Sequence, residues 1–269
     1  MIVREIGEDQ LLCISQSSHA LMSLQFCQHW GNQQFTRPEP FDVVMLAVAQ
    51  HDNGWVEWES APKLRADRYP MDFINEDDPG GKVDLWRRGM MRAYAQHPYA
   101  GILVGNHAVL LYESALNTSG LIADEGLRKK IQGFIDEHSR LIEQTRPDFA
   151  AIPSMQRALT PEAIERNTRY VQLGDTASLQ VCMPWAKKHT IPDFPMNDTQ
   201  TVDIEMEWGL TSDGPMIWFD PWPYHVDLFM VSIHGRLLSQ RVFANEQRYH
   251  EALARAPYQQ LEWQVMRQT

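Results

Sequence analysis

The sequence has little cysteine, and the cysteines present are not paired. Its 269 residues include three cysteines, Cys13, Cys27 and Cys182, an odd number without C-x-x-C spacing. Disulfide frameworks and thiolate-rich zinc sites both require cysteines in paired arrangements. The sequence therefore excludes a disulfide scaffold or zinc ribbon, and we expect the reduced thiols of a cytoplasmic protein.

Long apolar runs are also missing from the sequence. No segment approaches the roughly 20 apolar residues of a membrane-spanning helix. The first residues, MIVREIGEDQLLC, carry acidic side chains where a secretory signal peptide has an apolar stretch. We therefore expect a soluble protein with no membrane partner.

Basic residues are outnumbered by acidic ones. The chain has 24 Lys and Arg against 35 Asp and Glu, which gives a formal net charge of −11. Such a surface repels the phosphate backbone of nucleic acids, so nucleic acid is excluded as a general partner. A small phosphorylated substrate remains compatible, because metal ions can reverse the electrostatic field inside a pocket. The sequence predicts no particular oligomeric state.

Helical periodicity dominates the first two thirds of the chain. Hydrophobic residues make up 43% of the sequence, enough for a folded core. Thr160, Pro161 and Glu162 form a typical helix start, with a capping hydroxyl, a proline at the first position and an acid in the first turn. The apolar spacing predicts helices over 17–30, 41–53, 83–96, 99–117, 122–145 and 161–181.

Strand patterns lie at both ends of the chain. MIVREIGEDQLLCIS predicts a β-hairpin, and TVDIEMEW alternates apolar and polar residues after a break near residues 186–199. MIWFDPWPY, DLFMVSIHGRLLS and LEWQVM have similar strand character. We therefore predict a mainly α protein with a smaller β subdomain built from both ends. Its parts are a hairpin over 1–16, a helical domain over 17–185 and a β-rich part over 196–269.

Four polar residues lie at the centre of apolar helix faces: His19, His107, His138 and Asp175. Positions three, four and seven apart share a helix face, and His19 shares its face with Met22, Phe26 and Trp30. Hydrogen-bonded core histidines are the structural alternative for the three imidazoles, and this alternative stays open. A buried carboxylate such as Asp175 costs several kcal/mol unless it is paired or bound to a metal.

The stretch AVAQHDNGW places His51 and Asp52 at the end of an apolar helix. The helix dipole favours His51 at this position but disfavours Asp52, and a cation beside Asp52 would offset that penalty. The following Asn53-Gly54 pair is suited to a left-handed helix cap. Imidazole nitrogens and carboxylate oxygens together suit Zn, Fe, Mn or Co.

A helical histidine, an adjacent His-Asp pair and a distant aspartate resemble the HD-domain superfamily of metal-dependent phosphohydrolases. The resemblance covers roughly residues 15–182 and implies an HD-like helical bundle that holds a divalent metal ion. The ligands it implies are His19, His51, Asp52 and Asp175.

Members of that superfamily with two metals have two further histidines between the pair and the last aspartate. His107 and His138 lie in that interval, so the resemblance implies one or two ions, with Asp52 as the bridge between two. The chain lacks the GYP-type signature of cyclic-dinucleotide phosphodiesterases, and this counts against such a substrate.

A second resemblance covers nearly the whole chain. The segments MIVRE, TRPEP, HDNGWVEW and DPWPY are similar to an uncharacterised bacterial family, domain of unknown function 3891. That family name implies no activity.

From the metal site we expect a hydrolase that acts on a phosphate ester or phosphoanhydride of a small molecule. Asp52 is the expected catalytic residue, since it would both bind the metal and orient the attacking water. Trp55, Glu57 and Trp58 are candidate substrate-binding residues, although packing in the core is the alternative for both tryptophans.

Two other functions stay open at this point: a di-iron oxygenase of the same superfamily, which needs the same ligands, and a non-catalytic binding module. Five other histidines lie in loop or strand patterns and receive no role: His97, His189, His225, His234 and His250.

Overall fold

The computed structural model describes residues 1–118, 121–183, 185–212 and 214–268. Helices hold 49% of the residues and strands 23%, and seven strands form one sheet curled into a half-barrel. The protein is therefore mixed α/β, and the prediction of a mainly α bundle with a small β subdomain is wrong. The sequence patterns underestimate the sheet because β3 (Lys188–Pro195) contains two prolines, which resemble a break between elements.

Strands from both ends of the chain make up the sheet, in the order β1-β2-β6-β7-β5-β4-β3. All neighbouring strands are antiparallel except β5 and β7, and the N-terminal hairpin joins the rest through pairing of β2 with β6. The strands are β1 (Ile2–Ile6), β2 (Gln10–Ile14), β3 (Lys188–Pro195), β4 (Thr201–Thr211), β5 (Gly214–Asp220), β6 (Leu228–Leu238) and β7 (Tyr258–Met266).

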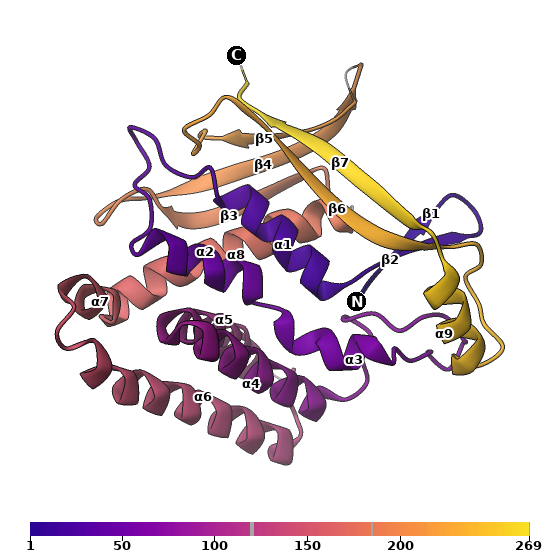
Figure 1. Cartoon of the computed structure of the whole chain (residues 1–269), viewed down its shortest axis with the longest axis horizontal. Coiled ribbons are helices and arrows are strands. Elements are labelled where there is room, and N and C mark those ends of the chain that lie inside the picture. Colours follow the sequence, from indigo (N-terminus) through magenta and orange to yellow (C-terminus); the bar gives the residue numbers. More distant parts are fainter. Residues whose placement is uncertain (119–120, 184, 213, 269) are drawn as a thin grey trace.

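Helices α1, α2 and α8 lie on one side of the sheet (Figure 1), with α1 in contact with β6 and α8 in contact with β3. Helix α9 packs instead against Leu11 and Cys13 of β2, whose neighbours Leu12 and Ile14 face the main core. Helices α4, α5 and α6 form a layer farther from the sheet. The α-helices are α1 (Gln16–Cys27), α2 (Phe41–Gln50), α3 (Val56–Ser60), α4 (Pro79–Gln96), α5 (Pro98–Asn117), α6 (Glu125–Thr145), α7 (Pro153–Ala158), α8 (Pro161–Cys182) and α9 (Glu246–Arg255), with short 3-10 helices η1 (Asn53–Trp55) and η2 (Pro147–Phe149).

Local sequence signals account for the main helices. The Thr160 hydroxyl accepts a hydrogen bond from the backbone N–H of Ala163, and Pro161 occupies the first turn of α8, as the sequence predicts. Helix α2 ends at Gln50, three residues earlier than predicted. Asn53 and Gly54 do not form a left-handed cap, because the chain continues directly into η1.

One hydrophobic core joins the sheet to the helices. The fully buried ring of Trp30, just after α1, contacts Tyr170 on α8, Phe194 on β3 and Tyr224 after β5. The same cluster includes apolar residues of α2, α5 and β7. In the described part of the chain, every helix falls short of the length and apolar character that crossing a membrane requires.

Candidate metal centre

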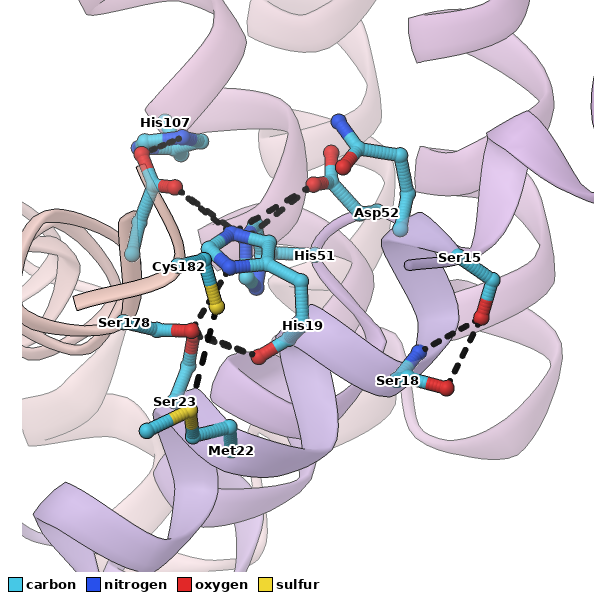
Figure 2. A network of polar contacts seen from close by, with 12 residues as sticks. Ser15, Ser18, His19, Met22, Ser23, His51, Asp52, His107, Ser178 and Cys182 are labelled. Atoms are coloured by element: carbon cyan, nitrogen blue, oxygen red, sulfur yellow. Dashed lines mark hydrogen bonds and ion pairs between the residues drawn. The ribbon is translucent and has the colours of Figure 1, made fainter. Parts of the chain in front are cut away.

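Four side chains meet in the interior between α1, α8 and the end of α2. His19 lies in the first turn of α1, His51 and Asp52 follow α2, and Asp175 lies on α8. The Nε2 atom of His19 is 2.9 Å from Asp175 Oδ1 and 3.7 Å from Asp52 Oδ2. The Nε2 atom of His51 is 3.5 Å from Asp52 Oδ2 and 3.6 Å from Asp175 Oδ1. Figure 2 shows the labelled His19, His51 and Asp52 pointing toward one another.

The donor atoms of His19, His51 and Asp175 fit a single divalent cation, and Asp52 Oδ2 lies next to both imidazoles. Zinc and similar ions bind nitrogen and oxygen ligands at about 2.0–2.2 Å, so neighbouring ligands lie roughly 3.0–3.5 Å apart. The four separations are close to this range, and the donors of His19, His51 and Asp175 all lie within 4.8 Å of one another. The buried Nε2 of His51 has no hydrogen-bond partner among the described residues, as a metal ligand requires.

Neighbouring groups hold both imidazoles with Nε2 facing the site. The Nδ1 of His51 donates to the carbonyl oxygen of Val48 at 2.8 Å. The Nδ1 of His19 lies 2.7 Å from Ser178 Oγ, and the Ser178 hydroxyl in turn donates to the carbonyl oxygen of His19. Such bonds on the outer nitrogen set the tautomer and direct the other nitrogen toward a metal.

The electrostatics of the site favour a cation. Burial lowers the pKa of His51, but the nearby charges of Asp52 and Asp175 outweigh burial and raise it to about 9. Burial raises the pKa of Asp175, but the hydrogen bond of His19 and the charges of His19 and His51 hold it well below its usual value. Without a metal, the imidazolium of His51 balances the carboxylates; a bound metal takes its place and releases the proton.

His107 on α5 borders this cluster. Its Nε2 lies 3.6 Å from Asp175 Oδ2, whereas His19 and His51 lie nearest to Oδ1 of the same carboxylate. Burial lowers the pKa of His107 to about 4, against the opposing charge of Asp175. The ring contacts Trp86 on one side, and its Nδ1 is buried without a hydrogen-bond partner among the described residues. A neutral imidazole therefore lies beside the candidate metal position.

The structure does not bring His138 into the cluster. Its Nε2 donates to the carbonyl oxygen of Ile102 at 2.9 Å, and its ring packs against Gly105 of α5. Gly105 and His107 are two positions apart, which is about 200° around the helix. His138 therefore faces the opposite side of α5 and is a hydrogen-bonded core histidine, the structural alternative considered for it.

The candidate substrate-binding residues also lie away from the four donors. The rings of Trp55 and Trp58 pack edge to face at 5.7 Å, and Trp58 contacts the small apolar cluster between β1, β2 and α9. Glu57 is exposed and forms ion pairs with Arg88 and Arg92 of α4. Trp55 meets the cluster only through its backbone, whose N–H donates to the carbonyl oxygen of Asp52 at 3.1 Å. For the side chains of these three residues, no contact with His19, His51, Asp52 or Asp175 is found among the described residues.

Sequence reasoning did not identify Ser178 as part of the site. Ser178 is buried and lies three residues after Asp175, which places both side chains on the same face of α8. This spacing from Asp175 was the only sequence feature that could have indicated that Ser178 lies near the metal centre. A serine on a helix face has many other uses, so the spacing alone did not point to His19.

Comparison with known proteins gives a family and no activity. A family model described as "Protein of unknown function (DUF3891)" matches residues 1–240. No curated protein matches the chain, and no solved structure matches it. Because the family match spans well over half of the sequence, the chain belongs to the DUF3891 family of proteins of unknown function.

Proposed function

We propose that this protein is a metal-dependent hydrolase that acts on a phosphate ester or phosphoanhydride of a small molecule. The observation that carries the proposal is the convergence of two imidazole nitrogens and two carboxylate oxygens on one largely buried site. The resemblance to the HD-domain superfamily, in the order of the histidines and aspartates, supports the same proposal. The proposed ligands of one Fe, Mn, Co or Zn ion are His19, His51, Asp52 and Asp175.

A bound divalent cation would polarise a phosphoryl oxygen and lower the pKa of a coordinated water toward neutrality. In the proposed mechanism, Asp52 accepts a hydrogen bond from the attacking water and orients it. His107 is neutral near pH 7 and can form a hydrogen bond with a substrate oxygen beside Asp175. Burial of His51 and Asp52 limits competing bulk water.

One ion is favoured over two. A second ion would have His107 and a shared carboxylate as protein ligands, because His138 faces away from the site. This arrangement also weakens the di-iron oxygenase alternative, which needs two complete ligand sets. The three free cysteines are all buried, which agrees with a reducing, cytoplasmic location.

The test combines metal analysis with variants. We expect freshly purified protein to contain about one equivalent of transition metal, and Asp175→Asn to lose most of it because one anionic ligand becomes neutral. His138→Gln is the matched control, since it replaces another buried polar residue but should keep the metal. Circular dichroism establishes that both variants fold.

Activity is then measured with Mn, Co, Zn and Fe on a panel of phosphomonoesters, phosphodiesters and nucleotides. We expect phosphate release by the wild type and a loss of at least 100-fold in Asp52→Asn. Absence of stoichiometric metal, or wild-type metal content in folded Asp175→Asn, would refute the metal centre. Iron-dependent O₂ consumption without phosphate release would instead support the oxygenase.

A further inference from the structure

A second feature lies apart from the metal centre. A cavity of about 320 Å³ opens between the start of α1, α3, α9 and strands β6 and β7. Of the described residues that line it, none is a candidate metal ligand. We call it the α9 hollow and define it by Ser18, Glu59, His234, Arg236, His250 and Tyr258.

Arg236 on β6 supplies a fixed positive charge to the α9 hollow. Its Nη1 donates to the carbonyl oxygen of Ala256 at 2.8 Å, and its guanidinium stacks 3.7 Å from the ring centre of Tyr258. These two contacts hold the guanidinium in place. Among the described residues Arg236 has no carboxylate partner, so its other N–H groups remain available to a ligand.

Further polar side chains line the same space. His250 donates from Nε2 to the carbonyl oxygen of Pro62 at 2.7 Å, which orients the ring, and His234 has no polar partner among the described residues. The Ser15 hydroxyl donates to Ser18 Oγ at 2.9 Å. Because that bond uses the Ser18 oxygen as acceptor, the hydrogen of the Ser18 hydroxyl is free to donate.

Glu59, the one carboxylate among the described residues that line the α9 hollow, already has hydrogen-bonding partners. Glu59 accepts a hydrogen bond from the backbone N–H of Gln16 at 2.7 Å and lies 2.8 Å from the nitrogen of Met1, and its side chain is 10% exposed. The chain as a whole has a net charge of −11. The α9 hollow, in contrast, contains a guanidinium without a carboxylate partner among the described residues, and two imidazoles. Pro62, Leu253 and Ala254 add apolar walls.

We propose that the α9 hollow binds a small organic anion, with a carboxylate or phosphate group held by Arg236 and an apolar or aromatic body against the walls. The volume lies at the lower end of the range of small-molecule sites, about 300–1,000 Å³. A planar guanidinium matches either anion with two parallel hydrogen bonds. The proposal is independent of the activity at the metal centre.

The test uses isothermal titration calorimetry with four probes on the full chain: benzoate, phenyl phosphate, neutral benzyl alcohol and cationic benzylamine. We expect the anions to bind and the other two not to bind. Benzoate and phenyl phosphate distinguish a carboxylate ligand from a phosphate ligand. Loss of one charge-assisted contact in Arg236→Gln should weaken binding about 10-fold or more.

Matched controls separate this site from the metal centre. Arg248→Gln removes an exposed arginine of α9 outside the hollow and should bind as the wild type does. If the anion binds in the α9 hollow, Asp175→Asn should keep anion binding. If the anion binds to the metal ion instead, Asp175→Asn should lose binding and Arg236→Gln should keep it. His234→Asn, at an exposed position, is the second test if Arg236→Gln does not fold, and it should also weaken binding.

Two results would overturn the proposal. One is the absence of anion binding up to millimolar concentration in the folded wild type. The other is binding of benzylamine in place of the anions, with loss in Glu59→Gln, since that would make the α9 hollow a cation site.

Discussion

Asp52 occupies a position where the dipole of α2 disfavours a negative charge. The structure places its carboxylate 3.5 Å from Nε2 of His51 and 3.7 Å from Nε2 of His19. The raised pKa of His51, about 9, shows the reciprocal effect of that carboxylate and of Asp175 on the imidazole. The charge that is unfavourable at the helix end is therefore compensated within the site, by a protonated histidine or by a metal ion.

Ser178 allows a direct test of how His19 is oriented. Ser178→Ala removes the oxygen 2.7 Å from His19 Nδ1 and frees the ring to rotate or change tautomer. We expect metal affinity to fall about 10- to 100-fold, as is typical for loss of a partner that orients a metal-binding histidine. Titration against a competing chelator measures this affinity.

Two further variants show whether Ser178 acts through orientation. Ser139→Ala removes an exposed serine hydroxyl that donates within α6, and it should leave metal affinity unchanged. Ser178→Thr keeps the hydroxyl and should restore most of the affinity. Equal metal affinity in wild type and folded Ser178→Ala would contradict the orienting role, even if the melting temperature changed.

At the scale of elements, the turn η1 sets the position of the His51-Asp52 pair against α4. Gly54 in this turn is buried, and a Cβ atom there would lie 2.1 Å from the backbone oxygen of Leu85. Glycine is required here by the close approach of two backbones and not by a left-handed conformation. The prediction of a left-handed cap at Asn53-Gly54 is therefore wrong, although a glycine is needed at this position for packing.

We expect Gly54→Ala to separate η1 from α4 and to destabilise the protein by roughly 1–3 kcal/mol. Metal affinity should also fall, because Asp52 immediately precedes the displaced turn. Gly133→Ala is the matched control: its Cβ would meet no atom within 4 Å in the middle of α6, and it should stabilise by up to about 1 kcal/mol. Urea unfolding measures both changes, and equal stability of the two variants would refute the packing argument.

The positions of prolines explain both the helix starts that were predicted correctly and the strand that was missed. The starts of α5 and α8 were predicted to within one residue, since prolines in the first turn mark both. Strand β3 was missed because Pro192 and Pro195 interrupt its sequence. It lies at the edge of the sheet, where prolines are tolerated because one side of the strand needs no hydrogen-bonding partner.

At the scale of the whole molecule, the last strand closes the sheet. β7 lies between β6 and β5 and pairs with both, so it joins the half that contains the N-terminal hairpin to the half that contains β3 and β4. The family match ends at residue 240, before β7 begins. The fold therefore depends on a segment outside the matched region.

We expect a chain truncated after Gln240 not to fold, because the sheet would be divided and Trp263 and Val265 would be lost from the core. Far-UV circular dichroism and thermal unfolding of the purified fragment measure this. A truncated chain with the spectrum and cooperative melting of the full chain would show that β7 is dispensable.

The sequence by itself determined which residues face inward on each helix. His19, His107 and His138 were all predicted on apolar faces, and all three are buried, because periodicity is a local property of the helix. Periodicity does not say which partner an inward face meets. Packing of α8 against α1 and α5 placed Asp175 beside His19 and His107, whereas α6 directed His138 to the other side of α5. The α9 hollow likewise exists only because residues from both ends of the chain meet across β2 and β6. Contacts between residues so distant in sequence were decided by the tertiary structure alone.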